Sequence, residues 1–97
     1  MTLQIEGDAQ SGYSMRGNLT YETVPELFGK NLQFAAETRI DLDKMERIDS
    51  AGLALLVEWS CEARRRNGCV ILEHIPDSLK LLIDVSNLRD VLSIAND

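Results

Sequence analysis

The chain has 97 residues, of which 44% are hydrophobic and 27% charged, and its formal net charge is −6. This composition is that of an ordinary globular domain and argues against intrinsic disorder, so we expect a single domain over residues 1–97. The negative charge would repel phosphate backbones, which argues against nucleic-acid binding. No apolar run approaches the roughly 18 to 20 residues of a membrane span, so we expect no direct membrane insertion.

Cysteine usage and the N-terminus bear on compartment and cofactors. Cys61 and Cys69 are too few for a disulfide framework, and their spacing with the single histidine, His74, fits no common zinc pattern. The first ten residues lack the basic and apolar regions of a signal peptide. No P-loop or other glycine-rich phosphate motif is present. We therefore expect a cytoplasmic protein with free thiols, no metal and no cofactor.

The N-terminal region predicts a hairpin. The alternation in "LQIEG" predicts a strand over residues 2–6, and "YSMRG", after the turn-prone "GDAQSG", predicts its antiparallel partner over residues 13–17. A third strand is expected over residues 38–42, where the short apolar run in "TRIDLDKM" ends in acidic residues.

The first predicted helix covers residues 24–36, between these strands. Thr23 and Glu26 have the spacing of a capping box, and Pro25 falls in the first turn, where its missing N–H does no harm.

The longest predicted helix covers residues 50–67 and is capped by Asp49 or Ser50. Three arginines fall in its last turn, and Gly68 suits the left-handed position that ends a helix. Apolar spacing predicts a broad buried face, and Trp59 is expected in the core. The positions that follow the i, i+3, i+4, i+7 pattern are Leu53, Leu56, Val57 and Ser60.

The C-terminal part predicts three more elements. A strand is expected over residues 69–73, then a helix from the cap Asp77 to the terminator Asn87, and an edge strand within residues 90–95. Strands that alternate with helices in this way imply an α/β fold whose sheet is at least partly parallel, with helices packed on it.

The stretch "IDLDKMERIDSAGLALL" resembles the signature of the STAS domain family. Asp41 matches the aspartate that ends a strand in the family pattern, and Asp49, Ser50, Gly52 and Leu53 match its loop–helix motif. The order of elements agrees over nearly the whole chain. The resemblance implies the STAS fold, a mixed sheet of about four to five strands with three or more helices, and a role in binding proteins.

Within the family, the "GLALL" run and the ending "LKLLIDVSNL" are most similar to free-standing STAS subunits of Mla-type ABC transporters. Such subunits imply an ABC transporter ATPase subunit as partner, in a phospholipid transport complex that maintains outer-membrane lipid asymmetry. The chain would then be peripheral to the inner membrane through that partner. The alternative is an anti-sigma factor antagonist switched by phosphorylation of Ser50, although Ala51 departs from the second serine common in that group.

Ser50 has several interpretations. A capping role alone leaves the small residues after it unexplained, because glycine costs a helix about 1 kcal/mol against alanine. Small residues at an exposed helix start would let a partner's backbone approach closely, and a phosphate on Ser50 would add charge beside an acidic residue. The predicted partner-binding residues are Asp49, Ser50, Ala51, Gly52, Ala54 and Glu58.

Catalysis has little support. The nucleophile elbow G-x-S-x-G is only half met around Ser50, because Ile48 stands where its first glycine belongs, and His74 is the only histidine that could serve as its base. Asp41 is expected to accept hydrogen bonds from loop N–H groups, and Asp43 and the arginine run 64–66 to be solvated. We therefore expect no enzyme.

Overall fold

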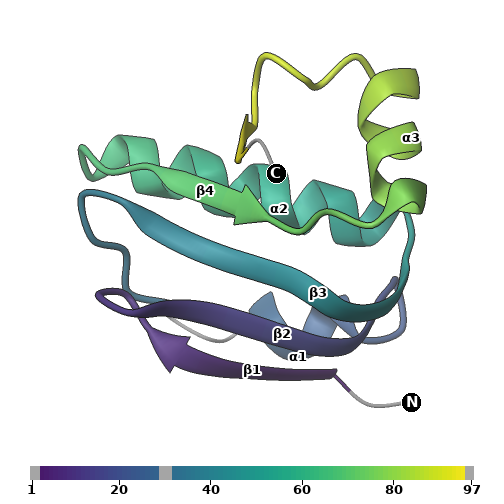
Figure 1. Cartoon of the computed structure of the whole chain (residues 1–97), viewed down its shortest axis with the longest axis horizontal. Helices are drawn as coiled ribbons and strands as arrows, with labels where there is room; N and C mark the ends of the chain where they lie inside the picture. The colour runs from purple at the N-terminus through teal and green to yellow at the C-terminus, as the bar shows by residue number, and fades with distance from the viewer. Residues whose placement is uncertain (1–2, 29–31, 96–97) are drawn as a thin grey trace.

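A computed structural model describes residues 3–28 and 32–95 of the chain, and its elements follow the predicted order (Figure 1). The α/β prediction is confirmed, because the described residues form one five-stranded mixed sheet and three helices. The elements are β1 (Leu3–Asp8), β2 (Gly12–Leu19), α1 (Val24–Phe28), β3 (Thr38–Ile48), α2 (Ser50–Arg65), β4 (Val70–Glu73), α3 (Asp77–Val85) and β5 (Ser93–Ile94).

The strands lie in the order β1-β2-β3-β4-β5. β1 is antiparallel to β2, and the other three pairs are parallel. The carboxyl ends of β2, β3 and β4 therefore meet at one edge of the sheet, on the right in Figure 1. The start of α2 lies at this same edge, which is where parallel sheets commonly place their binding residues.

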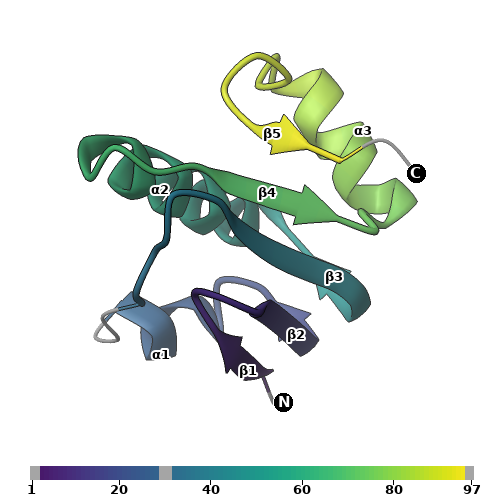
Figure 2. The same cartoon turned by 60° about the vertical axis from the view of Figure 1, so that its left-hand side comes forward.

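The core lies between the sheet and the helices. α2 packs along β3 and β4, and α1 and α3 contact its flanks (Figures 1 and 2). Alternate residues of β2 and β3, among them Met15 and Ile40, are fully buried, as is Leu56 of α2. Trp59 is only 6% exposed, which confirms its predicted place in the core.

β3 is longer than predicted. It continues past Leu42 to Ile48, through a charged stretch that we expected to be a loop. This part pairs with β2 in parallel, with two irregularities in the register. Met45 and Ile48 are buried on its inner side, and this burial explains why a stretch with so many charges remains a strand.

The first helix is shorter than predicted, because α1 ends at Phe28. Residues 29–31 of the predicted range lie outside the described residues, and residues 32–36 are neither helix nor strand. In this region, backbone groups bond to side chains instead of to one another in a helix. Gln33 O accepts a hydrogen bond from the Tyr13 hydroxyl at 2.9 Å, and Ala35 N donates to Thr38 Oγ1 at 2.7 Å.

The predicted capping box at α1 is not formed. The hydroxyl of Thr23 accepts a hydrogen bond from Thr20 N at 3.0 Å and donates one to Asn18 O at 2.7 Å. Thr23 thus fixes the turn that follows β2 instead of capping the helix with its side chain.

α2 ends two residues earlier than predicted, at Arg65. Asn67, with φ of 62°, takes the left-handed position that we expected of Gly68. Gly68 is required for a different reason: a Cβ atom there would lie 2.6 Å from Ala35 O. Its N–H donates to Ala63 O at 2.7 Å, which closes the helix end.

The remaining boundaries shift by small amounts. The residue Thr2 of the first predicted strand lies outside the described residues, and β4 begins one residue after Cys69. Pro76 occupies the N-cap position of α3, so Asp77 is its first helical residue and makes no capping hydrogen bond. Asn87, with φ of 58°, follows α3 as the predicted terminator.

Candidate docking surface at the start of α2

The carboxylate of Asp49 caps α2. Its Oδ1 accepts hydrogen bonds from Ala51 N at 2.9 Å and from Gly52 N at 3.1 Å, two of the amides that a helix start leaves without partners. Of the two predicted caps, Asp49 therefore fills the role. Ser50 is the first helical residue and is exposed.

The same carboxylate also holds the turn after β2. Oδ2 of Asp49 accepts a hydrogen bond from Tyr21 N at 3.0 Å, and Asp49 N donates to Leu19 O at 3.2 Å. One side chain therefore attaches the start of α2 to a turn from a distant part of the sequence.

Gly52 is explained by packing within the chain. It is buried, and a Cβ atom at this position would lie 2.2 Å from Leu19 O and 3.1 Å from Ile48 Cγ2. We expected this glycine to admit a partner's backbone, but the backbone that approaches it is that of β2. Ala51, next to it, is half-buried against the core.

The other predicted residues lie along one side of α2. Ser50, Ala54 and Glu58 follow at intervals of four residues, and all three are exposed. Glu58 is the only charged member, and its Oε1 lies 3.7 Å from Arg65 Nη1. This stripe, which we call the docking surface, presents two small side chains followed by an acidic one.

Tyr21 is a neighbour of this surface that our sequence analysis missed. Its side chain is 71% exposed. The turn that carries it lies between β2 and α1 and is attached to the start of α2 through Asp49. The sequence feature that could have pointed to Tyr21 is its position in "LTYETVP", as an aromatic residue outside any predicted strand or helix.

Asp41 and His74 form a pair at the carboxyl end of β4. Asp41 Oδ1 accepts a hydrogen bond from Asp43 N and contacts His74 Nδ1, both at 2.9 Å, and Asp43 is exposed as expected. Partial burial raises the pKa of the Asp41 carboxyl, but the hydrogen bond from Asp43, the contact with His74 and the charge of Lys44 together lower this pKa below its ordinary value. Asp41 is therefore a carboxylate with fixed backbone and side-chain partners.

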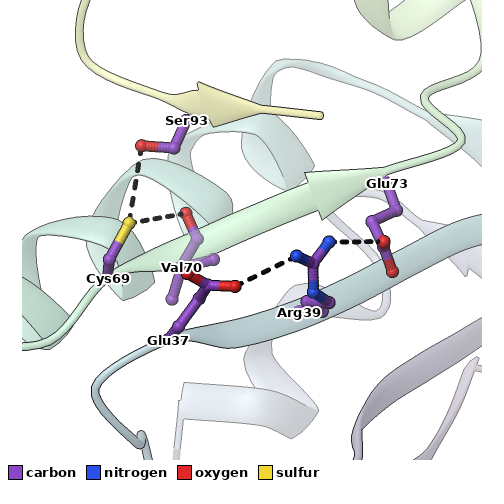
Figure 3. A network of polar contacts seen from close by, with 6 residues as sticks. All are labelled: Glu37, Arg39, Cys69, Val70, Glu73 and Ser93. Atoms are coloured by element: carbon purple, nitrogen blue, oxygen red, sulfur yellow. Dashed lines mark hydrogen bonds and ion pairs between the residues drawn. The ribbon is translucent and has the colours of Figure 1, made fainter. Parts of the chain in front are cut away.

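A hollow of about 380 Å³ lies beside the N-terminal hairpin. Arg39, a cationic residue of its lining, bridges Glu37 at 3.0 Å and Glu73 at 2.9 Å (Figure 3). The hydrogen bond that Arg39 donates to Glu73 and the charges of both glutamates raise the pKa of Arg39. The cation is thus already neutralised, which leaves the hollow poorly suited to an anionic ligand.

The arginine run at the end of α2 is solvated, as expected. Arg65 and Arg66 both pair with Glu62, and the Arg64 guanidinium donates to Val91 O. Within residues 3–28 and 32–95, no cluster of three or more acidic, histidine or cysteine side chains is placed to bind a metal ion. In that same part of the chain, no helix has the length and apolar character to cross a bilayer.

Three matches with known proteins describe what this chain resembles. A family model described as "Mlab, STAS domain" matches residues 3–93. The anti-sigma-B factor antagonist of Bacillus subtilis (strain 168) is 28% identical over 95 residues, which cover 95% of this chain and 85% of that protein. The structure of the anti-sigma factor antagonist SpoIIAA in its unphosphorylated form superposes with a TM-score of 0.65 at 15% identity, covering 99% of this chain and 89% of that one, and this likeness shows the common fold.

Proposed function

The chain belongs to the STAS domain family, and we propose that it is an MlaB-like, non-catalytic subunit that binds the ATPase of an Mla-type ABC phospholipid transporter. STAS domains are generally binding and regulatory domains. In this role the chain would support assembly and activity of the transporter and so help to maintain lipid asymmetry. It would lie at the cytoplasmic side of the inner membrane, held there by its partner.

The observation that carries this proposal is the exposed, rigidly held start of α2. Ser50 and Ala54 present small side chains on a helix whose first turn is fixed by Asp49. Small side chains let another protein approach closely, and a surface that is already ordered loses little entropy on binding. The description of the matching family model supports the choice of an Mla-type partner.

The mechanism would be docking, with no chemistry by this chain. Ala54 would lie at the centre of the contact, and Glu58 would add a charge at its rim. Charges at a rim mainly steer association and exclude wrong partners, whereas the packed centre sets how long the complex lasts.

A second candidate function, an anti-sigma factor antagonist, is supported by the Bacillus subtilis relative. Ser50 is exposed in the first turn of α2, so a kinase could reach it. A phosphate there would add about −1.5 to −2 charges beside Asp49. The helix dipole would favour this charge, but the carboxylate would oppose it, so the effect would fall on binding more than on the fold.

One experiment separates the two functions. The tagged chain is purified from its native cells, the bound proteins are identified, and the intact mass is measured. An ABC ATPase together with membrane subunits supports the proposal. A kinase partner and a phosphate adduct on Ser50 support the alternative.

The docking surface is tested with Ser50→Asp. This variant should weaken ATPase binding by about tenfold or more, because it places a charge in a close-packed contact. Ser78→Asp is the matched control, since Ser78 is an exposed serine in the first turn of α3. Equal binding by both variants would contradict the docking surface.

A further inference from the structure

We infer that Tyr21 is the aromatic anchor of the docking surface, held in place by Asp49, and that it fits an apolar pocket with a basic rim on the ATPase subunit. The inference rests on the proposed function and adds to it one residue and the chemistry of the partner's surface.

Tyr21 is unusual in its exposure. Three large hydrophobic side chains are strongly exposed in the described part of the chain: Tyr21 at 71%, Leu81 at 65% and Val85 at 76%. Tyrosine is among the residues that contribute most to binding energy at protein interfaces, whereas leucine and valine are under-represented there. Of the three, Tyr21 therefore has the chemistry of an anchor.

The backbone that carries Tyr21 is fixed on both sides. Its own N–H donates to Asp49 Oδ2 at 3.0 Å. The preceding residue, Thr20, donates through N to Thr23 Oγ1 and accepts through O from Thr23 N and Val24 N. Only the two side-chain torsions of the tyrosine then need to be ordered on binding, and this keeps the entropy cost low.

The turns that carry Tyr21 and Ser50 are both held by the carboxylate of Asp49. Asp49 Oδ1 caps the turn that presents Ser50, and Oδ2 holds the turn that presents Tyr21. A charge placed on Ser50 would lie next to the carboxylate that holds both turns. The two side chains therefore belong to one surface, although they come from different parts of the sequence.

The charge around Tyr21 points to a basic partner. Glu22 and Glu26 are exposed on the same turn and on α1, and neither has an ion pair among the described residues. Arg47 is the nearest cation before Asp49 in the sequence. It is exposed on β3 and forms no ion pair with either glutamate in the described part of the chain. A basic rim on the partner would complement the two glutamates.

Leu81 and Val85, the two exposed apolar residues of α3, lack these unpaired charges around them. Lys80 lies 4.0 Å from Asp77, and Arg89 lies 2.6 Å from Asp84, so the nearby charges are paired within the chain. Leu81 is therefore a suitable control, as a large exposed apolar residue outside the inferred contact.

The test measures the affinity of the purified full chain for the ATPase subunit that co-purifies with it. Tyr21→Ala should weaken binding at least about 25-fold, and Tyr21→Phe should keep most of the affinity. Leu81→Ala should leave the affinity unchanged, and the melting temperature should be similar for all three variants because both side chains are exposed. Glu22→Gln should reduce the loss of affinity that added salt causes.

The outcomes distinguish the inference from the proposed function. If the wild-type chain binds the ATPase and Tyr21→Ala binds equally well, the inference is overturned and the proposed function stands. If the wild-type chain binds a kinase instead, the proposed function fails, and the same variants measured on the kinase decide whether Tyr21 is the anchor. If it binds neither, both are overturned.

Discussion

The two ends of α2 are held in different ways. At its start, Asp49 binds the turn after β2 through hydrogen bonds, and Gly52 lies so close to β2 that a larger side chain would not fit. At its end, Glu62 pairs with Arg65 and Arg66 on the surface, and Asn67 turns the chain. At the start, the side chain that caps the helix also binds a distant turn, whereas the ion pairs of Glu62 at the end join residues only three and four positions apart. This difference supports our proposal that the docking surface lies at the start.

The largest effect is expected at the start, from Gly52→Ala. The added Cβ atom would lie 2.2 Å from Leu19 O, so the helix or the strand must move. We expect a loss of about 3 kcal/mol in unfolding free energy, although glycine to alanine normally favours a helix. Urea unfolding measures the effect. Ser50→Ala in the same turn is the control, and it should change the unfolding free energy by less than about 0.5 kcal/mol. A stable Gly52→Ala protein would remove the contrast between the two ends.

Asp49→Ala should come next. It removes the partner of Ala51 N, Gly52 N and Tyr21 N, and we expect a loss of about 2 kcal/mol. Hydrogen exchange should show faster exchange at these three amides. Asp77→Ala is the matched control, because Asp77 begins α3 without a capping hydrogen bond. Unchanged exchange at Tyr21 would show that the turn is held by something other than Asp49.

At the other end, Asn67→Ala should cost about 1 kcal/mol, because alanine is disfavoured at the φ of 62° that Asn67 adopts. Asn67→Gly should be neutral or slightly stabilising, since glycine adopts this conformation freely. Thermal unfolding of the two variants provides the comparison. Equal stability of both would show that the helix does not need the left-handed turn to end.

The smallest effect is expected for Glu62→Gln. Both ion pairs of Glu62 are solvent-exposed, so we expect a loss of about 0.5 kcal/mol or less, which should disappear in about 1 M salt. Denaturant unfolding at low and high salt tests this. A larger loss that persists in salt would mean that the end of α2 is held as firmly as its start.

The sequence predicts what depends on neighbours along the chain. The order of elements, the exposure of Ser50 as a helix-start residue and the burial of Trp59 all follow from local patterns. The role of Gly52 does not, because the atom it must avoid belongs to β2. Tyr21 was missed for the same reason: the carboxylate that fixes it lies 28 residues away.

The same limit explains the wrong boundaries. The last part of β3 is charged, so its sequence alone resembles a loop. It is a strand because it pairs with β2 and buries Met45. The sequence after α1 resembles a helix, but its backbone groups form hydrogen bonds with the side chains of Tyr13 and Thr38 instead. Parallel pairing joins strands that are distant in the sequence, so their contacts leave little local signal.

The three hydrogen bonds of Asp49 also bear on when the chain becomes recognisable. Tyr21 and Ser50 come together only after β2 and β3 have paired, because the carboxylate that links them lies just beyond β3. A nascent or partly unfolded chain would not display the two side chains together. A partner that binds both would therefore select completed domains, and each binding event would draw the folding equilibrium further toward the native state.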